Sequence, residues 1–225
     1  MTGTLFIVST PIGNLNDLSP RAQRVLAEVD IVACEDTRHT GRLLKRLGIS
    51  SRLVSLHEHN EQRRLPGLLA TLEAGNDVAL VSDAGTPLLS DPGYPLVRAA
   101  IESDLHVVPV PGPSAALAAL VASGLPPYPF TFGGFPPPKR SRRRRFFSRF
   151  SDLRHTFVFF EAPHRILGSL DDAREVFGDR PAAIARELTK MHEETLRGKL
   201  SELEAEIASR PSIKGEFCVV VGASP

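Results

Sequence analysis

The feature that most constrains the fold is a repeated alternation, over the first 123 residues, between short apolar runs and helix-forming segments. Each run is predicted to be a buried strand and each following segment a helix. Strand–helix units in series are typical of an α/β domain with a mostly parallel sheet and helices on both faces. The predicted strands are residues 5–9, 31–34, 53–56, 78–81 and 106–110, and the predicted helices are 20–28, 39–47, 61–74, 94–103 and 114–123.

Local signals support the ends of these helices. Ser19 is a suitable N-cap, and Pro20 stands at the first helical position, where its missing N–H costs nothing. Gly48 and Gly75 follow two of the predicted helices and favour their termination. Pro66 lies inside the third predicted helix and indicates a kink or a later start.

The composition changes after residue 123. Residues 124–138 contain six prolines and two adjacent glycines, which predict an extended linker and surface loop. The remainder predicts a second α/β domain with a mixed or antiparallel sheet: strands at 156–160, 182–186, 195–199 and 216–221, and helices at 165–177 and 200–209. The predicted organisation is therefore a domain over 1–123, a linker over 124–138 and a domain over 139–225. Ligands of such proteins favour strand carboxyl ends and domain interfaces.

Composition excludes several classes of protein. The net charge of the 225 residues is +1, so any contact with nucleic acid must be local. Cys34 and Cys218 lie apart in apolar runs, which argues against a zinc site or disulfides and favours a reducing cytosol. The first residues read as a strand instead of a signal peptide, and no apolar run approaches the roughly 18 residues that would span a membrane.

A long polar loop follows the fourth predicted strand. Residues 82–93 mix Gly, Pro, Ser, Thr and Asp without a helical or strand period. The hydroxyls of Thr86 and Ser90 and the carboxylates of Asp83 and Asp91 could bind a ribose or an ammonium group. The alternative is an ordinary turn that caps the next helix.

Similar segments follow other strands. In residues 110–115 two prolines flank a glycine, and Ser114 can cap the next helix. In residues 159–165, Glu161 and His164 are candidates for acid–base chemistry, although Glu161 could equally be a solvated carboxylate. Residues 186–190 contain a charged pair at the end of a strand. Such pairs are more often structural than functional.

Residues 34–40 place Glu35, Asp36 and Arg38 together at the end of the second strand. A functional cluster and a solvated helix cap are equally consistent with this pattern. His57 and His59 follow the third strand, but their spacing matches no familiar zinc motif, so no metal is expected.

A dense basic run follows the proline-rich segment. Six of the seven residues 139–145 are cations, which predicts salt-dependent contact with RNA phosphates, against the alternative of a solvated face. These cations are Lys139, Arg140, Arg142, Arg143, Arg144 and Arg145. Neither a GxGxxG nor a Walker A sequence is present.

Five segments of the sequence occur in the order found in one known family. They are residues 9–14 (STPIGN), 35–40 (EDTRHT), 82–93 (SDAGTPLLSDPG), 110–115 (VPGPSA) and 161–165 (EAPHR). Over essentially its whole length the chain resembles the ribosomal RNA methyltransferase branch of the tetrapyrrole methylase superfamily, whose members methylate the 2′-hydroxyl of a cytidine in 16S ribosomal RNA. Members usually continue well beyond the last strand, whereas this sequence stops at Pro225.

The resemblance implies S-adenosyl-L-methionine as cofactor, folded in a cleft between the two α/β domains. It implies Glu35 or Asp36 as the acceptor near the ribose hydroxyl, with Arg38 orienting it or a phosphate, and His57 and Glu58 as runners-up. It also implies that the basic run, residues 139–145, binds the phosphates of the RNA. The cofactor-lining residues that it implies are Pro11, Asp83, Ala84, Gly85, Thr86, Pro87, Leu89, Ser114, Ala115, Phe160, Glu161, Ala185, Arg186, Glu187, Leu188, Gly215 and Glu216.

The implied partner is 16S ribosomal RNA or the small ribosomal subunit, in the cytoplasm, and the fold implies a homodimer. Three alternatives remain: a methyltransferase of this fold acting on a tetrapyrrole or a protein, a non-enzymatic RNA-binding assembly factor, and a phosphate-binding metabolic enzyme. The basic run argues against a tetrapyrrole substrate, and an assembly factor would bind no cofactor.

Overall fold

The computed structural model describes residues 2–224. The chain divides into two compact units between Ser114 and Ala115. Each unit is built on its own five-stranded sheet with helices on both faces.

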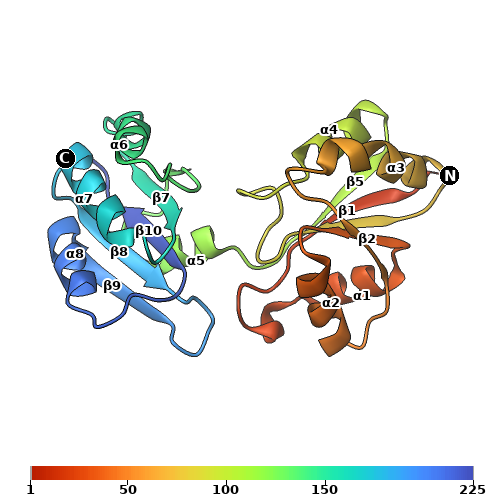
Figure 1. Cartoon of the computed structure of the whole chain (residues 1–225), viewed down its shortest axis with the longest axis horizontal. Coiled ribbons are helices and arrows are strands. Elements are labelled where there is room, and N and C mark those ends of the chain that lie inside the picture. Colours follow the sequence, from red (N-terminus) through yellow and green to blue (C-terminus); the bar gives the residue numbers. More distant parts are fainter. Residues whose placement is uncertain (1, 225) are drawn as a thin grey trace. The chain divides into compact units, whose positions relative to one another are not determined.

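The first unit contains a fully parallel sheet in the order β3-β2-β4-β1-β5 (Figure 1). Its strands are β1 (Thr4–Val8), β2 (Ile31–Cys34), β3 (Arg52–Ser55), β4 (Val78–Val81) and β5 (His106–Val110). Its helices are α1 (Pro20–Glu28), α2 (Thr37–Arg46), α3 (Glu61–Glu73) and α4 (Tyr94–Glu102), with a short 3-10 helix at Leu15–Asp17. The predicted mostly parallel α/β sheet is confirmed.

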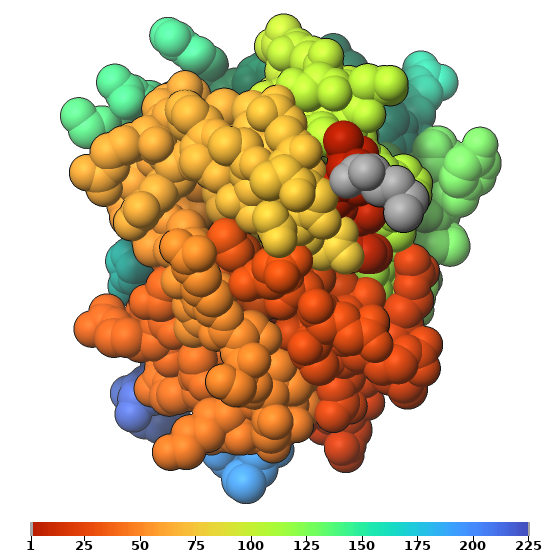
Figure 2. Space-filling view, turned by 90° about the vertical axis from the view of Figure 1, so that its right-hand side faces the viewer, coloured from red at the N-terminus to blue at the C-terminus, as the bar shows by residue number. Residues whose placement is uncertain are grey.

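Alternation along each strand produces two cores. Val32 and Cys34 of β2 pack with α1 and α2, whereas Ile31 and Ala33 pack with α3 and α4. Figure 1 shows the sheet between these two pairs of helices. Because both faces are covered, β2 and β4 are buried throughout, as central parallel strands require. In Figure 2 the orange and yellow segments, which include α2 and α3, lie on the surface of this unit.

The helix ends follow local chemistry. Ser19 accepts a hydrogen bond from the Ala22 amide, which confirms it as the N-cap of α1. Helix α2 begins at Thr37, two residues before the predicted start, because Asp36 caps it through the Arg38 amide. Helix α3 starts at Glu61 as predicted and contains Pro66, so the alternative of a later start after the proline is wrong.

The second unit contains a mixed sheet in the order β6-β7-β10-β8-β9. Only β6 and β7 are parallel; the other pairs are antiparallel, which confirms the predicted mixed sheet. The strands are β6 (Phe130–Phe132), β7 (Thr156–Glu161), β8 (Pro181–Arg186), β9 (Glu194–Lys199) and β10 (Phe217–Val221). The helices are α5 (Ala115–Ala122), α6 (Arg140–Ser148), α7 (Ile166–Phe177) and α8 (Leu200–Ala208).

The division between the two units comes before α5, earlier than the position near Gly124 that the composition predicted. Ala116, Ala119 and Leu120 pack on β7, β8 and β10, so the helix belongs to the second sheet. Residues 124–138, predicted to be a linker, lie inside the second unit and supply β6. The composition change at Gly124 therefore marks an irregular segment within a unit.

A buried ion-pair network fixes α6 to α7 on the opposite face of this sheet. The Asp172 carboxylate is fully buried, and its two oxygens accept hydrogen bonds from Arg143 Nε at 2.7 Å and from Arg140 Nε at 3.0 Å. Arg143 is itself buried and also donates to the carbonyls of Pro138 and Gly168. Phe147 completes the contact by packing in the core beneath α6.

Removing the Asp172 carboxylate should strongly destabilise the second unit, because it leaves the Arg143 charge buried without a counterion. We expect Asp172→Ala to lower the free energy of unfolding by about 3–5 kcal/mol. The matched control is Asp171→Asn, which affects a partly exposed carboxylate and should cost at most about 1 kcal/mol. Urea denaturation followed by circular dichroism measures both, and equal losses would contradict a special role for Asp172.

Candidate functional site

The carboxyl ends of all five strands in the first unit meet at one edge of the sheet. Val8 pairs with Val110, and Cys34 pairs with both Ser55 and Val81, so the strands end level with one another. The loops that begin after these residues contain every polar segment singled out in the first half of the sequence. This edge is where open α/β sheets bind ligands.

Backbone hydrogen bonds join the loop after β1 to the long loop after β4. The Thr10 amide donates to the Gly85 carbonyl at 2.9 Å, and the Gly85 amide donates to the Thr10 carbonyl at 3.1 Å. Gly85 has a φ of +81°, and a Cβ there would lie 3.3 Å from Ile12 Cγ2. Any side chain at position 85 would therefore strain the backbone, and Pro11 is held next to the pairing.

The Thr86 hydroxyl connects three loops. It accepts a hydrogen bond from Ser9 Oγ at 3.2 Å and donates one to the Pro113 carbonyl at 3.1 Å. The loops after β1, β4 and β5 are thus fixed to one another at a single side chain. Of the other predicted cofactor residues in this unit, Gly85 and Pro87 are buried, Asp83 and Ser114 are half-buried, and Ala84 and Leu89 are exposed.

Carboxylates gather at this edge. Burial and the neighbouring charges of Glu35 and Asp83 raise the pKa of Asp91 to about 6. Burial and the charge of Asp83 also raise the pKa of Glu35, partly offset by His57. The edge therefore carries a local excess of negative charge, although the whole chain is nearly neutral.

Glu35 and Asp36 have opposite environments despite being adjacent. Asp36 accepts hydrogen bonds from the amide and the guanidinium of Arg38, at 2.8 and 3.4 Å, and these bonds lower its pKa. Arg38 is therefore paired with Asp36. The half-buried Glu35 forms no ion pair within residues 2–224 and is the more basic of the two carboxylates.

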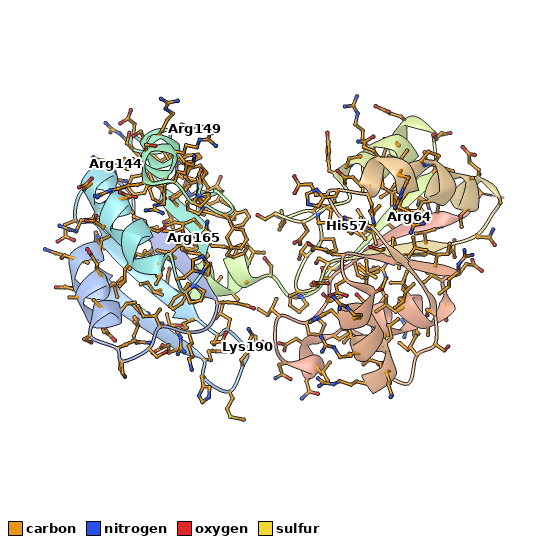
Figure 3. The ribbon with its side chains drawn as sticks, viewed as in Figure 1. His57, Arg64, Arg144, Arg149, Arg165 and Lys190 are labelled. Carbon is orange, nitrogen blue, oxygen red and sulfur yellow. The ribbon has the colours of Figure 1, made fainter. Side chains whose placement is uncertain are left out.

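The two histidines after β3 contact each other edge to face, with ring centroids 6.0 Å apart. Figure 3 labels His57, which lies in the loop after β3. Within residues 2–224, no group of three or more His, Cys, Asp or Glu side chains is placed to hold a metal ion.

The predicted residues of the second unit also meet at one edge of their own sheet. Because β10 is antiparallel to β7 and β8, its first residue, Phe217, pairs with Glu161 and with Arg186. Residues 160–161, 185–188 and 215–216 are thereby brought together. Ala185 is buried, and the ring of Phe160 packs against that of Phe132 with the ring centroids 4.9 Å apart.

Lys190, the last residue of the charged segment 186–190, organises this edge (Figure 3). Its ammonium group donates to Glu187 Oε1 at 3.1 Å and contacts Glu216 Oε2 at 3.0 Å. Glu187 Oε1 also accepts a hydrogen bond from the Glu216 amide at 3.0 Å. A Cβ at Gly215 would lie 2.6 Å from Glu187 Cγ, so the two loops pack in direct contact. A lone lysine after a strand gives no sequence signal for such a role.

Glu161 is occupied by structural contacts. Its fully buried carboxylate pairs with Arg165 at 2.6 Å and accepts hydrogen bonds from the Ser169 hydroxyl and the Ala162 amide. The alternative of a solvated carboxylate is therefore wrong. The side chain is fixed by the start of α7, so acid–base chemistry by Glu161 would require breaking these contacts.

The basic run forms part of α6, and its cations differ sharply in environment. Arg143 is buried against Asp172, so the prediction that it binds RNA is wrong. Arg140 and Arg144 are exposed but pair with acidic residues of α7, including Glu175. Figure 3 shows Arg144 on the side of α6 toward α7 and Arg149 away from it. Lys139, Arg142 and Arg145 are exposed and form no ion pair within the described chain.

Both cysteines are buried, and neither forms a disulfide. No helix in the part of the chain that the structure describes is long and apolar enough to cross a membrane.

The shifted pKa of Asp91 predicts a pH-dependent stability. The unfolded carboxyl loses its proton near pH 4, whereas the folded one holds it to about pH 6, so stability falls as pH rises through this interval. Asp91→Asn removes this loss. We expect the variant to gain more thermal stability over the parent at pH 7.5 than at pH 4.5, measured by calorimetry in the absence of ligand. An equal change at both pH values would contradict the prediction.

Comparison with known proteins identifies the family. The model for Tetrapyrrole (Corrin/Porphyrin) Methylases matches residues 4–204. The chain is 53% identical to "Ribosomal RNA small subunit methyltransferase I" of Micromonospora olivasterospora, over 100% of this chain and 72% of that protein. It is 51% identical to the protein of the same name from Pseudomonas aeruginosa, over 98% of this chain and 79% of that protein.

Solved structures show the same fold. Uroporphyrin-III-C-methyltransferase from Thermus thermophilus superposes with a TM-score of 0.63 at 23% identity, covering 98% of this chain and 94% of that one. A second structure, of the native form of this enzyme, gives a TM-score of 0.68 at 19% identity, over 98% and 97% of the two chains. The chain belongs to the tetrapyrrole methylase family, within which its relatives at 45–53% identity are ribosomal RNA small subunit methyltransferase I proteins.

Proposed function

We propose that this protein uses S-adenosyl-L-methionine to methylate the 2′-hydroxyl of a cytidine in 16S ribosomal RNA. The observation that carries the proposal is the carboxylate cluster at the strand ends of the first unit, because the methyl donor has a sulfonium and an ammonium against a single carboxylate and is therefore a net cation. The RNA substrate rests on the relatives, which share the sequence over nearly its whole length. This substrate implies a cytoplasmic protein, and a homodimer stays a prediction.

The residues at this edge fit the donor chemically. Burial and the charge of Asp83 raise the pKa of Glu35, and burial and the charges of Glu35 and Asp83 raise that of Asp91, an environment that a bound cation relieves. The tight pairing of Thr10 with Gly85 lets the backbone approach a ligand closely. In the second unit, Lys190 joins the two loops that contain Glu187 and Glu216, both predicted to line the cofactor. The cofactor-lining residues predicted from the resemblance are retained in the proposal, with Glu161 acting through its backbone.

When bound, S-adenosyl-L-methionine supplies a methyl group already activated by the positive sulfur. The protein has to position the ribose hydroxyl and accept its proton, since an alcohol is a weak nucleophile. A carboxylate serves as base when its pKa is raised toward the working pH. We therefore assign the proton acceptor to Glu35, and we assign Asp36 to capping α2 and holding Arg38.

Titration calorimetry of the purified protein with S-adenosyl-L-methionine tests the cofactor. We expect saturable binding that is weakened in Thr86→Val, because valine keeps the shape but loses both hydrogen bonds that join the three loops. The control is Thr71→Val, since the Thr71 hydroxyl donates to the Gly67 carbonyl within α3 and lies outside the loops of the site. Absence of binding by the folded parent protein would remove the cofactor assignment and favour a non-enzymatic assembly factor.

The neighbouring carboxylates provide a matched pair for the catalytic base. We expect Glu35→Gln to reduce single-turnover methyl transfer by about 10²–10⁴-fold, the usual contribution of a general base. Asp36→Asn should stay within about threefold of the parent, because asparagine caps helices as well as aspartate. The measurement is transfer of labelled methyl groups to small ribosomal subunits that lack the modification. Near-normal turnover in Glu35→Gln would overturn the assignment.

A further inference from the structure

Helix α2 carries a row of cations that is less dense in the sequence than the basic run on α6. Its ten residues contain Arg38, Arg42, Lys45 and Arg46 and no acidic residue. All four cations are exposed. Arg38 contacts the capping Asp36, but no ion pair forms at Arg42, Lys45 or Arg46 anywhere in residues 2–224.

The helix geometry aligns these cations on one face. Arg42 lies two residues from both Thr40 and Leu44, the two buried residues of α2, and so about 160–200° around the helix from them. Arg38, Arg42 and Arg46 succeed each other at intervals of four residues, which places each above the next. The outer face of α2 is therefore a continuous positive row, which we call the α2 stripe (Arg38, Arg42, Lys45, Arg46).

Helix stability alone does not account for the α2 stripe. Lys45 and Arg46 lie in the last turn, where they favour the helix dipole. Arg42 lies in the middle of the helix with like charges four residues away on both sides, an arrangement that destabilises a helix. The exposed arginines Arg140 and Arg144 of α6, by contrast, are paired with acids of α7. An anion bound along α2 would relieve the repulsion.

The position of the stripe indicates which anion. Helix α2 starts immediately after Glu35 and Asp36, so its first turn lies at the edge where the strands end. A polymer with regularly spaced negative charges could bind along the helix while one of its residues reaches Glu35. We propose that the α2 stripe binds the phosphodiester backbone of the RNA substrate and leads the acceptor nucleotide to Glu35. This inference rests on the proposed function and adds a second RNA-binding surface to it.

The test uses the triple variant Arg42→Gln/Lys45→Gln/Arg46→Gln, since glutamine preserves helix propensity. Binding to unmodified small ribosomal subunits is measured at several salt concentrations. We expect affinity to fall at least about tenfold near 0.1 M salt, and the slope of log K against log salt to shrink by about 2–3, because three phosphate contacts are lost. The single-turnover rate at saturating substrate and the affinity for S-adenosyl-L-methionine should be unchanged.

Two controls separate charge from structure. The charge-conserving variant Arg42→Lys/Lys45→Arg/Arg46→Lys should keep most of the affinity and the salt slope. Arg98→Gln removes an exposed arginine of α4 that already pairs with Glu102, and it should change neither. The single variant Arg42→Gln should stabilise the protein, by removing like-charge repulsion, while still weakening RNA binding; a purely structural arginine would not combine these effects.

The outcomes distinguish this inference from the proposed function. If the parent protein methylates the ribosomal subunits but the triple variant keeps its affinity and salt slope, the α2 stripe is a solvated face and the inference is overturned. If the parent protein neither binds the cofactor nor methylates the subunits, the proposed function fails, and the inference fails with it.

Discussion

The first unit depends on the common direction of its five strands. A parallel sheet brings all strand carboxyl ends to one edge, and the loops that leave this edge must satisfy their backbone groups without a ladder. The pairing of Thr10 with Gly85 and the hydroxyl of Thr86 meet this requirement for three loops at once. The same contacts that complete the fold therefore also fix the geometry of the candidate site.

The two units differ in whether their buried and half-buried carboxylates are paired with cations. On α6 and α7, the buried Asp172 pairs with the buried Arg143 and with the exposed Arg140, which also pairs with Asp171 and Glu175, so every charge at that contact has a partner. At the strand ends of the first unit, Glu35 and Asp91 have no cation that compensates them fully, and their pKa values rise. Unpaired charge is costly to hold in a partly buried place. The cost is understandable if a cationic ligand occupies the site during function.

Hydrophobic periodicity predicted all five strands of the first sheet because each is a short apolar run between polar loops. It missed β6, whose three residues are too few to show a period, and α6, whose surface residues are mostly arginine. It also placed the division of the chain at Gly124, where the composition changes. The actual division depends on which sheet α5 covers, and contact between segments far apart in sequence leaves no local signal.

The basic run shows why the density of charge in a sequence is a poor guide to its availability. Arg143 lies within the run and is the least able to bind a phosphate, because a helix with a buried face takes every third or fourth residue inward. An arginine taken inward needs a carboxylate, and α7 supplies one in Asp172. The sparser cations of α2 remain exposed, because Thr40 and Leu44 occupy the positions of this helix that face inward. The phase of the charges relative to the buried face, more than their number, decides which surface remains positive.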